Sequence, residues 1–136
     1  MTVKLVKLYK GKIINNKKGD ITKYVSAKSS FFKKFGEVYF NEIVPYSSKG
    51  WIKHKTNTCL ITCLLGKVKF HLIDERGKEL KIFLNSKDKN ILKIPPKIWF
   101  CFRSYKNKSI IVNLIDKVHS NFEVVKKDKV KKYLIN

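Results

Sequence analysis

The sequence predicts an all-β fold, either a sandwich or a barrel. Short segments rich in alternating or β-branched apolar residues follow one another at spacings of roughly ten residues, with turn-forming residues between them. No long stretch with the period of an amphipathic helix interrupts this series before residue 121. Together these observations favour about nine or ten short strands in a sandwich or barrel.

Turn signals separate the predicted strands. They are the Asn-Asn-Lys-Lys-Gly-Asp run at 15–20, Pro45, Gly66, the Asp-Glu-Arg-Gly run at 74–77 and the double proline at 95–96. The strands expected between such signals are residues 3–9, 21–26, 37–44, 50–55, 60–65, 67–74, 80–84, 91–94, 98–102 and 109–115.

The apolar pattern supports most of these strands individually. Residues 60–65 form a nearly continuous apolar run, typical of a buried strand, and residues 67–74 alternate as a half-buried strand does. Residues 29–35 are ambiguous. The tail at 121–134 places a few apolar residues among lysines, which predicts a short helical or irregular C-terminal tail.

Length and composition predict one folded domain over residues 1–136. The 136 residues are 43% hydrophobic and 12% aromatic, enough for a core without disulfides or metals. No apolar run approaches the roughly 20 residues needed to span a bilayer. The N-terminus alternates lysine with apolar residues, unlike a signal peptide, so we expect a cytoplasmic protein. Cys59, Cys63 and Cys101 are odd in number and have apolar neighbours, so we interpret them as buried structural thiols.

The net charge of +21 suggests a polyanionic partner. Of the 31 basic residues, however, only Arg76 and Arg103 are arginine, whereas proteins that read nucleic acids usually use arginine for bidentate contacts. The composition therefore argues against a dedicated nucleic-acid-binding role. A smaller anion such as a nucleotide diphosphate fits the charge equally well.

Strand geometry places the central histidine. Residues two apart in a strand share a face, so Ile52 and His54 lie on one side while Trp51, Lys53 and Lys55 lie on the other. If this strand lines a barrel, His54 faces inward beside an apolar wall, a suitable setting for a general base. The alternative is a hydrogen-bonded histidine at the barrel rim.

Six short motifs resemble those of RmlC-like cupins in their order and spacing, over roughly residues 19–123. They are Lys18-Gly19-Asp20, Gly36-Glu37-Val38-Tyr39-Phe40, Lys49-Gly50-Trp51-Ile52-Lys53-His54-Lys55, Gly66-Lys67-Val68, Asp74-Glu75-Arg76 and Ile94-Pro95-Pro96-Lys97-Ile98-Trp99. The resemblance is to the dTDP-4-dehydrorhamnose 3,5-epimerase family and the neighbouring 4-keto-6-deoxyhexose 3,4-ketoisomerases.

This resemblance implies a double-stranded β-helix, or jelly roll, and a homodimer whose N-terminal strands cross between subunits. It implies a nucleotide-sugar substrate, a dTDP-4-keto-6-deoxyhexose, which binds inside the barrel. It also implies a role in surface polysaccharide biosynthesis. In such enzymes a histidine base removes a proton next to the keto group, and an acid, often tyrosine, returns one. No metal or redox cofactor is needed.

The residues that we assign to this site follow from the matched motifs. His54 is the candidate acid/base. Lys18, Lys49, Lys55, Arg76 and Arg103 are candidates for diphosphate contacts, and Trp99 and Phe100 for stacking on the base or sugar. Each has a plainer interpretation as a solvated lysine, a turn arginine paired with a neighbouring carboxylate, or a core aromatic.

The sequence also departs from the family pattern. Ile52 stands where the epimerases have their histidine base. The ketoisomerase pattern has histidine at both the Ile52 and the His54 positions, so only the second is present here, and Phe100 stands where a later histidine is expected. No tyrosine in residues 110–114 matches the expected acid. The ligands of a metal-dependent cupin would fall on Ile52, His54, Cys59 and Phe100, and one plausible ligand is too few for a metal site. Two alternatives therefore stay open: a catalytically lapsed cupin that binds a nucleotide sugar or another anion, and a general polyanion-binding protein.

Overall fold

The computed structural model describes residues 2–126, which form one short 3₁₀ helix and twelve strands. Their bounds are η1 Val3–Leu5, β1 Lys7–Lys10, β2 Lys12–Ile14, β3 Ile21–Lys23, β4 Glu37–Ile43, β5 Ser48–His54, β6 Cys59–Leu65, β7 Lys67–Ile73, β8 Glu79–Asn85, β9 Asn90–Ile94, β10 Trp99–Ser104, β11 Ser109–Ile115 and β12 Val124–Lys126.

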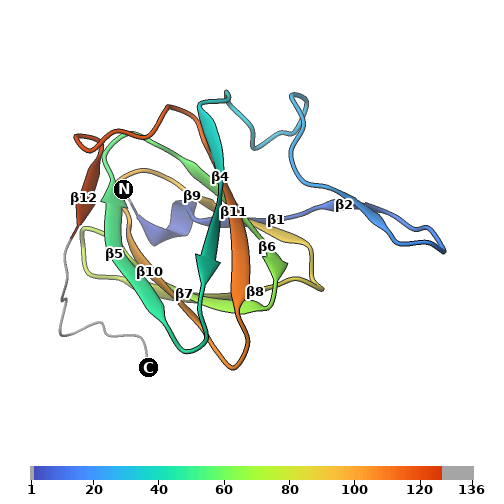
Figure 1. Cartoon of the computed structure of the whole chain (residues 1–136). Helices are drawn as coiled ribbons and strands as arrows, with labels where there is room; N and C mark the ends of the chain where they lie inside the picture. The colour runs from blue at the N-terminus through green and yellow to red at the C-terminus, as the bar shows by residue number, and fades with distance from the viewer. Residues whose placement is uncertain (1, 127–136) are drawn as a thin grey trace.

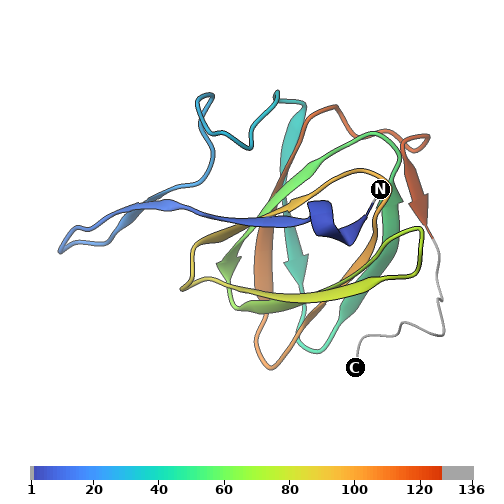
Figure 2. The ribbon, with the colours of Figure 1, turned by 180° about the vertical axis from the view of Figure 1, so that it is seen from behind.

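Two five-stranded antiparallel sheets face each other and form a jelly roll (Figure 1). One has the order β1-β9-β6-β11-β4 and the other β12-β5-β10-β7-β8. The hairpin of β2 and β3 pairs only with itself and projects away from the barrel, as the view from behind also shows (Figure 2). The predicted all-β fold is thus confirmed.

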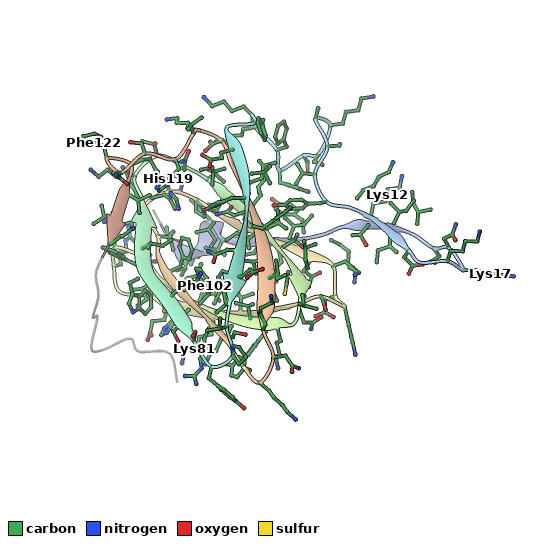
Figure 3. The ribbon with its side chains drawn as sticks, viewed as in Figure 1. Lys12, Lys17, Lys81, Phe102, His119 and Phe122 are labelled. Carbon is green, nitrogen blue, oxygen red and sulfur yellow. The ribbon has the colours of Figure 1, made fainter. Side chains whose placement is uncertain are left out.

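The main core lies between the two sheets because alternate residues of each strand point inward. Phe70 on β7 and Phe100 and Phe102 on β10 contribute large buried rings to it, and Phe102 is seen inside the barrel in Figure 3. Residues of β5, β7 and β10 that face away from this core form a smaller cluster on the outer face of the sheet, made of Trp51, Ile73, Cys101 and Trp99.

Gly50 lets β5 pass close to β10. Its φ is +111°, and a Cβ built there would lie 2.7 Å from the Cβ of Cys101. The pairing of β5 with β10 is irregular at this point, between Phe100 and Phe102. Beyond the irregularity, Trp51 joins the outer cluster while Ile52 packs against the main core, so the predicted division of faces is confirmed.

Two sequence predictions are corrected at the chain ends. Residues 3–9 are not one strand, because Val3–Leu5 form a 3₁₀ helix whose Val3 amide donates to Asp74, and the strand begins at Lys7. Within the tail predicted to be helical or irregular, Val124–Lys126 form β12, which pairs with β5. Residues 127–134 of that predicted tail lie outside the described residues.

The cysteine interpretation is confirmed, since Cys59, Cys63 and Cys101 are all buried free thiols. Over residues 2–126, no helix has both the length and the apolar character that a membrane crossing requires.

Candidate active site

A buried imidazole–carboxylate pair lies at the end of β5. Nδ1 of His54 is 2.7 Å from Oε2 of Glu123, and the two side chains are 4% and 9% exposed. The pairing of β12 with β5, with Val124 opposite His54, brings Glu123 there (Figure 1). A hydrogen bond from the amide of Lys55 to the carbonyl of Glu123 continues this pairing.

The carboxylate of Glu123 is held on both oxygens. Oε1 accepts hydrogen bonds from the amides of Thr56, at 3.1 Å, and Asn57, at 2.8 Å, while Oε2 accepts from His54. Burial by itself would raise the pKa of Glu123, but these donors outweigh it and hold the pKa below its ordinary value. Glu123 is therefore ionised at neutral pH and fixes the orientation of the His54 ring.

The other ring nitrogen of His54 is poised to react. A carboxylate can only accept, so Nδ1 of His54 carries a proton, and in the neutral ring Nε2 then has a free lone pair. That Nε2 is buried and has no hydrogen-bond partner among residues 2–126. Buried polar atoms are nearly always satisfied, so this exception points to a group that bonds to a ligand.

Aromatic rings fill the barrel beside His54. Its ring stacks on Phe100 with centroids 6.1 Å apart and planes 18° apart. Phe100 lies 6.5 Å from Phe70 and 6.2 Å from Phe102 between ring centroids. This wall lowers the local polarity on one side of the imidazole.

A second polar cluster faces the same interior from the opposite sheet. Tyr39 on β4 lies two positions from Asn41 and four from fully buried Ile43, so it points inward. Its hydroxyl accepts a hydrogen bond of 2.9 Å from the side chain of Asn113 on β11. Burial is the main cause that raises the pKa of Tyr39 to about 12, so the phenol keeps its proton at neutral pH. Burial likewise raises the pKa of the neighbouring Cys59 thiol to about 12, which leaves it un-ionised.

Two of the other predicted site residues, Phe100 and Lys55, are neighbours of His54. Phe100 contacts the His54 ring, and Lys55 follows it in the chain with an exposed side chain. Trp99 lies on the opposite face of the sheet, where the Nζ of Lys53 is 5.0 Å from its ring centroid. The two aromatic candidates therefore point to opposite sides of β10.

The remaining basic candidates are dispersed. Lys18 lies in the turn of the projecting hairpin, next to Lys17, which Figure 3 shows far from the barrel. Arg76 lies in the exposed β7–β8 turn, where its amide donates to Asp74. Lys49 and Arg103 lie near the other end of β5 and β10, since Arg103 pairs with Ser48, and the Nζ of Lys49 donates to Asn41 at 2.6 Å.

Sequence reasoning missed Glu123 and Tyr39. Glu123 is in a segment predicted as tail, although the β-branched pair that follows it is a strand signal. Tyr39 is in a correctly predicted strand, but the family resemblance implies an acid in residues 110–114, where the structure has Asn113, the partner of Tyr39.

The other histidines are separate from this site. His71 is on β7, in the same sheet as β5, but its side chain lies on the outer face of that sheet. Its Nε2 is 2.6 Å from Oε1 of Glu79 on β8. His119 lies in the exposed loop before β12. Within residues 2–126, no group of three or more His, Cys, Asp or Glu side chains is arranged to hold a metal ion.

Comparisons with known structures show the same fold. A dTDP sugar isomerase from Desulfovibrio desulfuricans is 24% identical, with a TM-score of 0.88 over 94% of this chain and 87% of that one. The 3,4-ketoisomerase QdtA from Thermoanaerobacterium thermosaccharolyticum, solved with TDP, is 24% identical, with a TM-score of 0.81 over 90% and 88%. A dTDP-4-dehydrorhamnose 3,5-epimerase from Bacillus anthracis, with TDP and pyrophosphate bound, is 15% identical, with a TM-score of 0.86 over 99% and 86%.

A comparison with curated proteins gave no match. The family model described as FdtA: WxcM-like, C-terminal matches residues 1–134, almost the whole chain. Together with the jelly roll and the motifs that resemble sugar-nucleotide cupins, this match shows that the chain belongs to the WxcM-like C-terminal (FdtA) family.

Proposed function

We propose that this protein is a sugar-nucleotide isomerase that moves the keto group of a dTDP-4-keto-6-deoxyhexose from C4 to C3. The observation that carries the proposal is the His54–Glu123 pair, with a carboxylate on Nδ1 and a buried Nε2 that has no partner among residues 2–126. The choice of substrate follows the similar ketoisomerase QdtA, a variant of which was solved with TDP-4-keto-6-deoxyglucose.

In the proposed reaction the 4-keto group acidifies the hydrogen on C3. Nε2 of His54 takes this proton, the C3–H electrons form a C3–C4 double bond, and the resulting enediolate is protonated at C4 by the same nitrogen. The C3 hydroxyl loses its proton as the C3 carbonyl forms, and the C4 oxygen gains one. Atoms and charge balance without an oxidant, because one carbon is oxidised as its neighbour is reduced.

A single imidazole favours isomerisation over epimerisation. Transfer between adjacent carbons can be carried out by one base on one face of the sugar. Epimerisation instead requires the base that the epimerases carry at the position of Ile52, together with an acid on the opposite face such as Tyr39. Ile52, which occupies the position of the family's epimerase base, cannot exchange a proton, so His54 is the one imidazole on the inner face of β5.

Tyr39 is the residue that we assign to proton transfer between the two oxygens. It is protonated at neutral pH, it faces the barrel interior from the sheet opposite β5, and Asn113 orients its hydroxyl. Because the rings of Phe70, Phe100 and Phe102 fill the barrel beside His54, we expect the sugar to enter on the side of Tyr39 and Asn41.

The diphosphate contacts are proposed to include residues from two subunits. Lys55 lies next to His54, whereas Lys18 is in a hairpin that stands away from its own barrel (Figure 1). Exchange of this hairpin in a homodimer would carry Lys18 to the partner. The exposed apolar residues of the hairpin support such exchange, since Ile13, Ile14 and Ile21 are 38%, 41% and 56% exposed.

Light scattering on the purified protein tests the dimer. Ile14→Lys and Ile21→Lys should shift the mass from dimer towards monomer, whereas Lys12→Ala on the same hairpin should not. A wild-type protein that is monomeric at micromolar concentration would contradict the exchange.

Product analysis tests the reaction. After incubation with dTDP-4-keto-6-deoxyglucose, the proton NMR spectrum should show a 3-keto sugar that is absent without enzyme. Unchanged substrate, or a product epimerised at C3 or C5 that keeps its 4-keto group, would contradict the assignment.

One observation favours a second candidate, a cupin that binds a nucleotide sugar without turnover. Ile52 and Phe100 are cross-strand partners and together replace polar residues of the family pattern with apolar packing. Calorimetric binding of a dTDP sugar by a protein that yields no product would favour this candidate.

A further inference from the structure

A basic groove lies where the β6–β7, β8–β9 and β10–β11 turns meet. Its volume is about 440 Å³, within the range of small-molecule sites. It is lined by Gly66, Lys67, Asn85, Ser86, Lys87, Tyr105, Lys106 and Asn107. Three of these residues are lysines and none is acidic, although the carboxylate of Asp88 lies beside the groove, where it accepts a hydrogen bond from Asn85.

Hydrogen bonds hold the turns around the groove together. The amide of Ser86 donates to the carbonyl of Gly66 at 3.0 Å, and the hydroxyl of Ser109 donates to the carbonyl of Lys67 at 3.1 Å. The hydroxyl of Ser104 donates to the carbonyl of Asn107 at 2.7 Å. These contacts join three turns that are distant in sequence, so the groove is built before any ligand arrives.

One aromatic ring lines the groove and a second lies next to it. Tyr105 lines it, and its ring lies 6.3 Å from that of Phe83, which is 45% exposed. The ammonium group of Lys67 is 4.6 Å from the Phe83 centroid and 6.0 Å from the Tyr105 centroid. A cation is thus held beside two flat rings, with the amides of Asn85 and Asn107 nearby.

We propose that this groove is a second anion site, which binds a free nucleotide with its base on Tyr105 and its phosphates on Lys67, Lys87 and Lys106. Lysines donate charge-assisted hydrogen bonds to phosphate oxygens, and an aromatic ring can stack on a base. The ring of Tyr105 is partly exposed, with the Cζ of Arg103 5.8 Å from its centroid. The side-chain amide of Asn107 can supply a donor and an acceptor for the edge of the base or the sugar hydroxyls, whereas that of Asn85 is hydrogen-bonded within its own turn.

This groove is separate from the His54 site. Along β10, Trp99 pairs with Lys53, next to His54, while Ser104 pairs with Val68 at the groove end. Five residues of strand therefore separate the two ends, roughly 17 Å at the usual rise per residue. The inference does not rest on the proposed isomerase function, because its residues and its ligand contacts are independent of His54.

Amide NMR spectra of the full chain, titrated with dTDP, test the proposal site by site. The amides of Ser86, Lys87 and Asn107 should shift in the wild type and equally in His54→Asn. The affinity for dTDP obtained from these shifts should fall about tenfold in Tyr105→Ala. It should fall about tenfold as well in the double variant that combines Lys67→Ala and Lys106→Ala. Lys7→Ala, which removes an exposed charge on β1, should leave the affinity unchanged.

Three outcomes would overturn the proposal. One is the absence of shifts in the groove amides at millimolar dTDP. Another is an equal loss of affinity in Lys7→Ala, which would mean binding by net charge alone. The third is binding of another anion as tightly as dTDP or more tightly. Pyrophosphate that binds as tightly as dTDP would show that the aromatic ring contributes nothing. Oligothymidylate that binds far more tightly would assign the groove to single-stranded nucleic acid. If the groove shifts persist in a protein without isomerase activity, this inference stands while the proposed function fails.

Discussion

Nδ1 of His54 lies 2.7 Å from Oε2 of Glu123, although the residues are 69 positions apart in the chain. The contact depends on β12, a three-residue strand that adds to the edge of the sheet next to β5. A carboxylate in this position holds the imidazole in the tautomer that leaves Nε2 free to take a proton.

The carboxylate of Glu123 should therefore affect turnover more than substrate binding. In Glu123→Gln we expect kcat to fall by about 100-fold or more, the range of general acid–base effects, with KM changed only a few-fold. Steady-state kinetics check this, with partial recovery expected in Glu123→Asp. Glu79→Gln, which alters the similar pair on the outer face, is the control, and an equal loss of kcat there would contradict the assignment.

Glu123 should also make stability depend on pH. Its pKa is lowered on folding from the ordinary value of 4.5, so its ionised form stabilises the fold above that pH, and this contribution is lost as the pH falls through the lower, folded-state pKa. Thermal unfolding should show wild type more stable than Glu123→Gln at pH 7, with the difference shrinking below pH 4.5. A difference in Tm that is as large at pH 3 as at pH 7 would contradict this account.

Ile52→His tests the face shared by residues 52 and 54. The substitution places a second imidazole on the inner face of β5, opposite Phe100. We expect it to destabilise the fold by about 1–3 kcal/mol, since a polar ring replaces core packing, and to add epimerised products. Denaturant unfolding and product NMR measure the two effects. A protein with unchanged stability and products would show that residue 52 does not reach the interior.

The close approach of β5 to its neighbouring strand β10 requires glycine at position 50. In Gly50→Ala we expect a loss of about 3 kcal/mol or more, because unfavourable φ adds to a Cβ contact of 2.7 Å with Cys101. Gly19→Ala is the matched control, since its φ is +125° but nothing lies within 4 Å of the added Cβ. Denaturant unfolding of both variants separates strain from contact, and equal losses would contradict the close approach.

Local patterns in the sequence predicted most of the fold. The alternation of Ile52 and His54 against Trp51 survives in the structure because strand geometry fixes which residues share a face. The apolar run at 60–65 is likewise a strand in the middle of its sheet. At residues 3–5 the pattern failed, because the contact of the Val3 amide with Asp74 favours a helical turn over an extended chain.

The site was less accessible to sequence reasoning because it is built from contacts distant in the chain. His54 could be chosen from its own strand, but its partner Glu123 depends on the pairing of β12 with β5. Trp99 and Phe100 are adjacent in a predicted strand and so must face opposite sides, but which of the two faces the interior follows from the pairing of β10 with its neighbours. The basic residues carry even less local signal, since the chain has 31 of them.

Solvent deuterium exchange tests the role of His54 most directly. In deuterated water, wild-type protein should place deuterium at C3 of the recovered dTDP-4-keto-6-deoxyglucose or at C4 of the 3-keto product, as measured by NMR or mass spectrometry. His54→Asn should abolish this incorporation, while His71→Asn, an equally buried histidine on the outer face, should retain it. Incorporation that persists in His54→Asn, or a wild type that converts the substrate no faster than His54→Asn does, would contradict the assignment of His54 as the base.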